Sequence, residues 1–199
     1  MAKLKVPVGP DDPVQGPADA PVTLVEYGDY ECPHCGHAYP IIKALQKRFG
    51  KQLRFAFRNF PLREIHPYAE VAAETAEFAA THGKFWEMHD LIFENQNSLS
   101  EQMLGELAQR LTLDRQALTD ALGSGAFAEG VRRDVSGGVR SGVNGLRHFL
   151  STASATTATS SWRRSAKRSK KQPANRLLSP EKTGIRSRSG MSTLPRVWA

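Results

Sequence analysis

The segment from residue 22 to residue 62 alternates between strand and helix patterns, and this order constrains the fold more than any other feature. "VTLVEYGDY" carries apolar residues up to Gly28, as is typical of a buried strand. Residues 38–49 then place apolar side chains at helical spacing before Gly50. "LRFAFRNFPL", residues 53–62, alternates again and meets a proline near its end. Strand, helix and strand in this order predict a βαβ unit with a parallel pair of strands.

Two cysteines, the only ones among 199 residues, lie three positions apart in "DYECPHCGHAYP". Cys32 follows the first predicted strand, where the free N–H groups and the positive end of the next helix stabilise a thiolate. Cys35, one turn along the helix, falls on the same side, and we expect it to be the more shielded thiol. The pattern predicts that Cys32 attacks and that Cys35 resolves.

Two residues between the cysteines are expected to tune their reactivity. Pro33 suits the start of a helix, because its missing N–H would have no partner there. His34, if protonated, adds positive charge beside the thiolate and makes the disulfide more oxidising. Asp29 and Glu31 act weakly in the opposite direction.

The remaining patterns divide the chain into further segments. Residues 1–20 hold several prolines and predict an extended lead-in. From about residue 64 to residue 142 the patterns are helical, with Ser100 as an N-cap and a last, weaker helix around residues 127–139. Three histidines in this block are predicted to be surface or helix-capping residues: His66, His82 and His89.

"VTLVEYGDYECPHCGHAYP", followed by "HPYAEVAAETAEFAATHGKFWEMHDLIFENQ", resembles the DsbA-like branch of the thioredoxin superfamily over residues 21–145. The resemblance implies an α/β, thioredoxin-like fold with a helical insertion at about residues 64–142. It also implies a thiol–disulfide oxidoreductase that exchanges a Cys32–Cys35 disulfide with protein or small thiols through a mixed disulfide. A redox partner would recycle the pair, and neither a cofactor nor a metal is implied.

The tail from residue 146 to residue 199 departs from this resemblance. It contains 12 of the 27 Lys and Arg residues but one of the 20 Asp and Glu residues, so it carries the positive charge of the whole chain. Its many Ser and Thr residues and weak apolar periodicity predict disorder. The family continues with Thr-Pro-Thr, whose proline is cis and faces the cysteines, and then with the last strands and a closing helix. No proline lies between Pro67 and Pro173 here, so these last elements are expected to be missing and the protein poorly stable.

A shifted reading frame would explain the tail. Synonymous codons can be chosen for residues 145–158 that, read from the third base of the Gly145 codon, spell Thr-Pro-Thr-Phe-Phe-Ile-Asn-Gly-Val-Arg-His-Asp-Gly. This is the loop and strand that the family places at this position. Our hypothesis is a single-base deletion near codon 145, in the gene or in its sequencing.

The residues alone leave other classes of function open. Cys32, Cys35, His34 and His37 could bind zinc, but no second Cys or His pair at ligand spacing accompanies them, so no metal is expected. The main alternative is a basic-tailed binding module for nucleic acid or another polyanion, with an idle CxxC. We expect no specific nucleic-acid partner, no membrane segment and a monomer. Without a signal peptide the chain as written is expected to be cytoplasmic, whereas the family is often exported.

Overall fold

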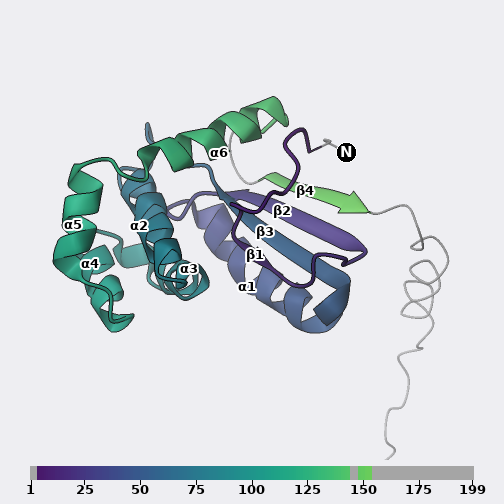
Figure 1. Ribbon diagram of the computed structural model, residues 1–199, viewed down its shortest axis with the longest axis horizontal. Coiled ribbons are helices and arrows are strands. Elements are labelled where there is room, and N and C mark those ends of the chain that lie inside the picture. Colours follow the sequence, from purple (N-terminus) through teal and green to yellow (C-terminus); the bar gives the residue numbers. More distant parts are fainter. Residues whose placement is uncertain (1–3, 144–147, 154–199) are drawn as a thin grey trace, which may run out of the picture. The chain divides into compact units, whose positions relative to one another are not determined.

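The computed structural model describes residues 4–143 and 148–153. Its centre is the predicted βαβ unit, which is confirmed. Strands β2 (Val22–Gly28) and β3 (Leu53–Asn59) are parallel, with Val22 opposite Leu53 and Gly28 opposite Asn59. Helix α1 (Pro33–Phe49) connects them, because parallel neighbours need a crossover (Figure 1). The 3₁₀ turn η1 (Gly50–Gln52) leads from α1 into β3.

Within the described part of the chain, the sheet has four strands in the order β1-β3-β2-β4. Strand β1 (Val14–Gln15) comes from the extended lead-in and pairs antiparallel with β3. Strand β4 (His148–Ala153) pairs antiparallel with β2, with His148 opposite Tyr27 and Ala153 opposite Val22.

Strand β4 corrects the expectation that residues 146–199 have no regular structure. Without β4, the edge of β2 would present a row of unpaired backbone N–H and C=O groups, and these groups bind a short neighbouring segment whatever its side chains. The rest of the predicted tail, residues 154–199, lies outside the described part of the chain.

Between β3 and residue 143, five helices build the helical block. They are α2 (Ala69–Thr81), α3 (Phe85–Glu94), α4 (Glu101–Arg110), α5 (Arg115–Gly123) and α6 (Ala128–Arg140), with a 3₁₀ turn η2 (Gln96–Ser98) between α3 and α4. Ser100 caps α4 as predicted, since its Oγ accepts a hydrogen bond from the N–H of Met103 at 3.1 Å. In Figure 1, α2 to α5 gather at one end of the sheet while α6 runs along it.

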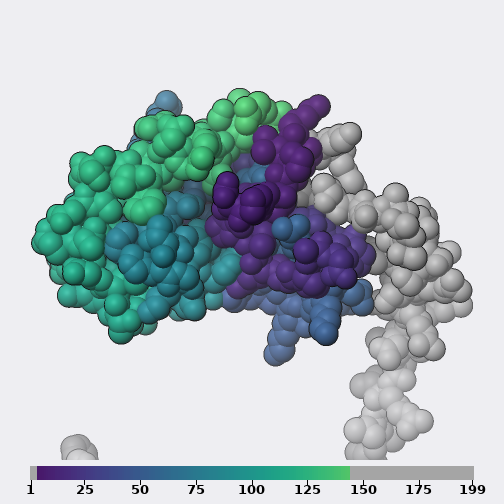
Figure 2. All heavy atoms as spheres, viewed as in Figure 1, coloured from purple at the N-terminus to yellow at the C-terminus, as the bar shows by residue number. Residues whose placement is uncertain are grey.

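The two faces of the sheet enter different apolar clusters because side chains alternate along each strand. Phe55 and Phe57 face the larger cluster, which contains both cysteines and residues from α1 to α6. Val25, Tyr27 and Ala56 face a smaller cluster with Phe60, against which Val135 of α6 and residues of the lead-in pack. Figure 2 shows the lead-in, in purple, against the green α6.

Alanine substitutions at two glycines of α6 are expected to change the free energy of unfolding in opposite directions. A Cβ at Gly138 would lie 2.8 Å from the ring of Phe60 and 2.9 Å from that of Tyr27, so Gly138→Ala should lower the free energy of unfolding by about 1–3 kcal/mol. A Cβ at Gly130 would have no neighbour nearer than 3.8 Å. Gly130→Ala should therefore raise the free energy of unfolding by about 0.5–1 kcal/mol through helix propensity. Urea denaturation measures both, and equal effects of the two substitutions would contradict this packing.

Candidate active site

Cys32 occupies the N-cap position of α1, directly after the turn that follows β2. The N–H groups of Cys35 and Gly36 donate to its carbonyl oxygen at 3.0 and 3.1 Å. Pro33 is the first residue of the helix, as predicted, and has no N–H to satisfy. Both thiols are free in this structure. The predicted placement of the pair between strand and helix is what the structure has.

Both cysteines are buried to the same extent, which corrects the expectation that Cys35 would be the more shielded of the two. Cys32 is 0% exposed and Cys35 is 1% exposed, whereas Pro33 and His34 are exposed. An incoming thiol therefore needs a local rearrangement before it can contact the Cys32 sulfur.

The environment of Cys35 favours its protonated form. Burial raises the pKa of the Cys35 thiol far above its ordinary value, and negative charge on Cys32 and on buried Glu26 of β2 adds to this. The N–H of Asp29 donates to Cys35 Sγ at 3.5 Å and opposes the shift in part. Cys35 is thus held as a thiol.

The carboxylate of Asp29 connects the turn around Cys32 to the loop between β3 and α2. Its Oδ1 accepts hydrogen bonds from the N–H groups of Glu31 at 2.8 Å and Cys32 at 3.2 Å. Its Oδ2 accepts from the N–H of Leu62 and interacts with Nδ1 of His66, each at 2.8 Å. Sequence analysis gave Asp29 only a weak electrostatic effect, and no local pattern indicates partners more than 30 residues away.

Gln96 in η2 also holds this turn, and sequence analysis missed it. Its Nε2 donates to the carbonyl oxygens of Tyr30 at 2.8 Å and Cys32 at 2.9 Å. A Cβ at Gly36 would collide with the Gln96 amide, so the glycine in "CPHCG" keeps room for this contact.

His89 is buried, contrary to the prediction of a surface or capping role. It is 4% exposed, contacts the hydroxyl of Tyr30 through Nδ1 at 3.0 Å and packs against the rings of Phe57 and Phe93. Burial, with the positive charge of Lys43, lowers the pKa of His89 to about 3. Most of the residues around His89 in α3 are aromatic or aliphatic, and a neutral histidine can be buried among them when a ring nitrogen has a hydrogen-bond partner.

The other two histidines differ from each other. His82 follows α2 and its Nδ1 lies 3.1 Å from the carbonyl oxygen of Phe78, which confirms a capping position. His66 is partly buried against Asp29.

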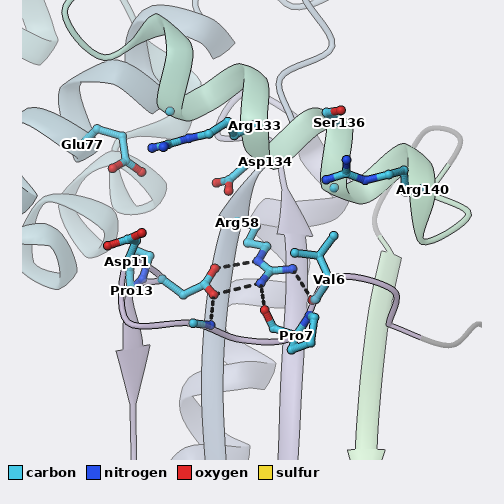
Figure 3. Close-up of a pocket in the computed structure, with 14 residues that line it drawn as sticks. Val6, Pro7, Asp11, Pro13, Arg58, Glu77, Arg133, Asp134, Ser136 and Arg140 are labelled. Atoms are coloured by element: carbon cyan, nitrogen blue, oxygen red, sulfur yellow. Dashed lines mark hydrogen bonds and ion pairs between the residues drawn. The ribbon is translucent and has the colours of Figure 1, made fainter.

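A separate pocket of about 390 Å³ lies between the lead-in, β3 and α6 (Figure 3). Arg58 is 3% exposed there, and all five of its N–H donors are used by Asp12, Tyr27 and the carbonyl oxygens of Val6 and Pro7. Neither cysteine lines this pocket. Arg58 therefore anchors the lead-in to the sheet.

Over residues 4–143 and 148–153, no three His, Cys, Asp or Glu side chains are placed to hold a metal ion. None of the helices in this part is both long and apolar enough to span a bilayer.

His89 makes stability depend on pH. The folded protein keeps His89 neutral down to about pH 3, whereas the unfolded chain takes up a proton near pH 6.5, so stability is lost as the pH falls from 6.5 towards 3. Relative to His89→Phe, the wild type should lose about 2 kcal/mol between pH 7 and pH 5. Burial raises the pKa of Asp134 to about 7, and this opposite contribution cancels because both proteins contain it. Urea unfolding at several pH values gives the difference, with exposed His82→Gln as control, and parallel curves for wild type and His89→Phe would refute the assignment.

Comparison with known proteins gives a family match and several similar relatives. A family model described as thioredoxin matches residues 9–146. The Na⁺/H⁺ antiporter NhaA 1 of Salinispora arenicola is 46% identical over 148 residues, which are 74% of this chain and 22% of the antiporter. NhaA 3 of Salinispora tropica is 47% identical over 154 residues and is covered to 24%. The chain thus spans less than a quarter of these relatives.

Among solved structures, oxidised BdbD from Bacillus subtilis is similar, with a TM-score of 0.65 and 25% identity over 80% of this chain and 91% of that one. The α-DsbA1 of Wolbachia pipientis has the same fold, with a TM-score of 0.64, 20% identity and coverage of 80% and 84%. The expected α/β, thioredoxin-like fold is therefore confirmed. With its CxxC pair at the start of α1, the chain belongs to the thioredoxin family, in the DsbA-like branch.

Proposed function

We propose that the chain is a thiol–disulfide oxidoreductase in which Cys32 exchanges with substrate thiols and Cys35 resolves the mixed disulfide. The observation that carries this proposal is the pair itself: Cys32 lies at the N-cap position of α1, and buried Cys35 lies one turn further along. Helix N-termini are where reactive cysteines occur in such enzymes. Exposed Pro33 and His34, beside the pair, would tune it.

In the oxidising direction, a substrate thiolate attacks Cys32 Sγ of the disulfide. The S–S bond breaks, and its electron pair goes to the sulfur of Cys35, which takes a proton. A second substrate thiolate then attacks the substrate sulfur of the mixed disulfide and releases Cys32 as a thiolate. In total two electrons pass from two substrate thiols to the pair, and the reducing direction runs these steps backwards.

The protonation of Cys35 gives the two sulfurs different roles. Burial makes Cys35 a poor leaving group, which needs a proton as the S–S bond breaks. It also holds Cys35 as a thiol in the reduced pair, so Cys35 attacks only when a base has taken its proton and the attacking thiolate is that of Cys32. The mixed disulfide therefore forms on Cys32. The substrates in this proposal are protein or small thiols, and a partner thiol or disulfide recycles the pair.

We also propose that the segment after residue 145 is read out of frame, which would remove the cis-proline loop and impair substrate binding. Resequencing the locus tests this. We expect the new sequence to show that one base is missing near codon 145, either from the gene or from its earlier sequencing. A reading frame that continues without a shift through codons 140–160 would refute this.

The alternative, a basic-tailed binding module with an idle CxxC, depends on a tail that lies mostly outside the described residues. Substitution of Cys32 separates the two functions. Polyanion binding would not need this sulfur, whereas exchange depends on it.

Trapping of the mixed disulfide tests the proposed roles. Cys35→Ser should accumulate a covalent complex with a disulfide-bearing peptide, because the resolving thiol is gone, and Cys32→Ser should give none. Non-reducing electrophoresis and mass spectrometry measure the yield, and dithiothreitol should release the peptide. Equal trapping by both variants, or by neither, would overturn the assignment of roles.

A further inference from the structure

Asp29, which lies outside the CxxC motif, contacts both cysteine residues, Cys35 through its backbone N–H and Cys32 through its side chain. The N–H of Asp29 donates to Cys35 Sγ at 3.5 Å, and its carboxylate Oδ1 accepts from the N–H of Cys32 at 3.2 Å. Asp29 is 4% exposed, so its charge lies in a poorly solvated place. Charges in such places act more strongly on their neighbours than charges in water.

The second carboxylate oxygen is held from the loop between β3 and α2. The N–H of Leu62 and Nδ1 of His66 each lie 2.8 Å from Asp29 Oδ2. The side chain of His66 is 14% exposed and that of Asp29 is 4% exposed, so this contact is also shielded from solvent. His66 thus reaches the neighbourhood of the thiols through Asp29 and not directly.

We propose that Asp29 and His66 form a pair of positioning residues that sets the reduction potential of the cysteine pair, an inference that rests on the proposed redox function. Asp29 fixes the turn on which Cys32 lies. Its negative charge opposes a thiolate and so disfavours the reduced form. His66, as a donor to Oδ2, draws this charge away from the sulfurs.

Other charges near the pair have separate partners or act on a different sulfur. The carboxylate of Glu31 accepts a hydrogen bond from the N–H of Tyr68 at 2.7 Å. Glu26 acts on Cys35 from β2. Arg63, in the same loop as His66, forms an ion pair with Glu70 at 3.1 Å.

The proposal and a purely structural role predict different directions for the shifts in reduction potential that follow removal of the Asp29 charge and removal of the His66 donor. If the pair only braced the turn, removing either residue would loosen it, and both variants would shift the potential in the same direction. If the pair acts through charge, removing the carboxylate and removing its donor shift the potential in opposite directions.

The experiment measures two quantities in the full chain: the equilibrium with glutathione and the rate of Cys32 alkylation by iodoacetamide. Asp29→Asn keeps an oxygen for the N–H groups of Glu31 and Cys32 but removes the charge. It should speed alkylation about three- to tenfold and make the pair more oxidising. His66→Leu, which leaves the carboxylate without this donor, should slow alkylation by a similar factor and make the pair more reducing.

Four further variants make the outcome decisive. His66→Gln, which still has an N–H donor, should restore most of the wild-type rate. The double variant Asp29→Asn/His66→Leu should behave like Asp29→Asn alone, since no charge remains for the donor to act on. Asp120→Asn and His82→Gln are the matched controls, because neither of these exposed side chains contacts the turn, and they should change nothing.

Shifts of Asp29→Asn and His66→Leu in the same direction, or no shift in folded variants, would overturn the inference. Circular dichroism of each sample shows whether it is folded, and a variant that unfolds is replaced by one that removes the same group, Asp29→Ser or His66→Met, for the same comparison. The proposed function fails separately, if the wild-type chain shows no two-electron equilibrium with glutathione.

Discussion

The parallel pairing of β2 with β3 is the constraint on which the rest of the structure depends. Because parallel strands end at the same edge of a sheet, the turn after Gly28 and the loop after Asn59 come out side by side. The turn carries Cys32 to the start of α1, and the loop brings Leu62 and His66 to Asp29. The candidate site is therefore assembled from two segments that are distant in sequence.

The turn that follows β2 is held by hydrogen bonds from side chains. The backbone from residue 29 to residue 32 cannot continue the sheet, so its N–H and C=O groups need other partners. The carboxylate of Asp29 satisfies the N–H groups of Glu31 and Cys32, and the amide of Gln96 satisfies the carbonyl oxygens of Tyr30 and Cys32. Tyr30 packs against the rings of Phe57 and Phe93, and its hydroxyl contacts His89. The position of the Cys32 backbone is thus determined by packing against the helical block as well as by α1.

Sequence patterns predicted the elements whose causes are local. Alternation of apolar residues identified β2 and β3, and helical spacing identified α1. Ser100, directly before a helical pattern, identified the N-cap of α4. The contacts of Asp29 with Leu62 and of Gln96 with Cys32 join residues 33 and 64 positions apart, and no periodicity reports such contacts. The burial of His89 and the pairing of β4 depend on neighbours from other elements, so composition alone suggested the wrong environment for both.

The central claim is that Cys32 and Cys35 form a redox pair poised by a folded domain. A titration of the full chain in glutathione buffers tests it most directly, with trapped thiols counted by mass spectrometry and circular dichroism recorded on the same samples. The structure predicts one two-electron transition, in which both cysteines change state together while the helical signal persists. Two independent one-thiol transitions, with alkylation at the rate of an unfolded peptide, would contradict it.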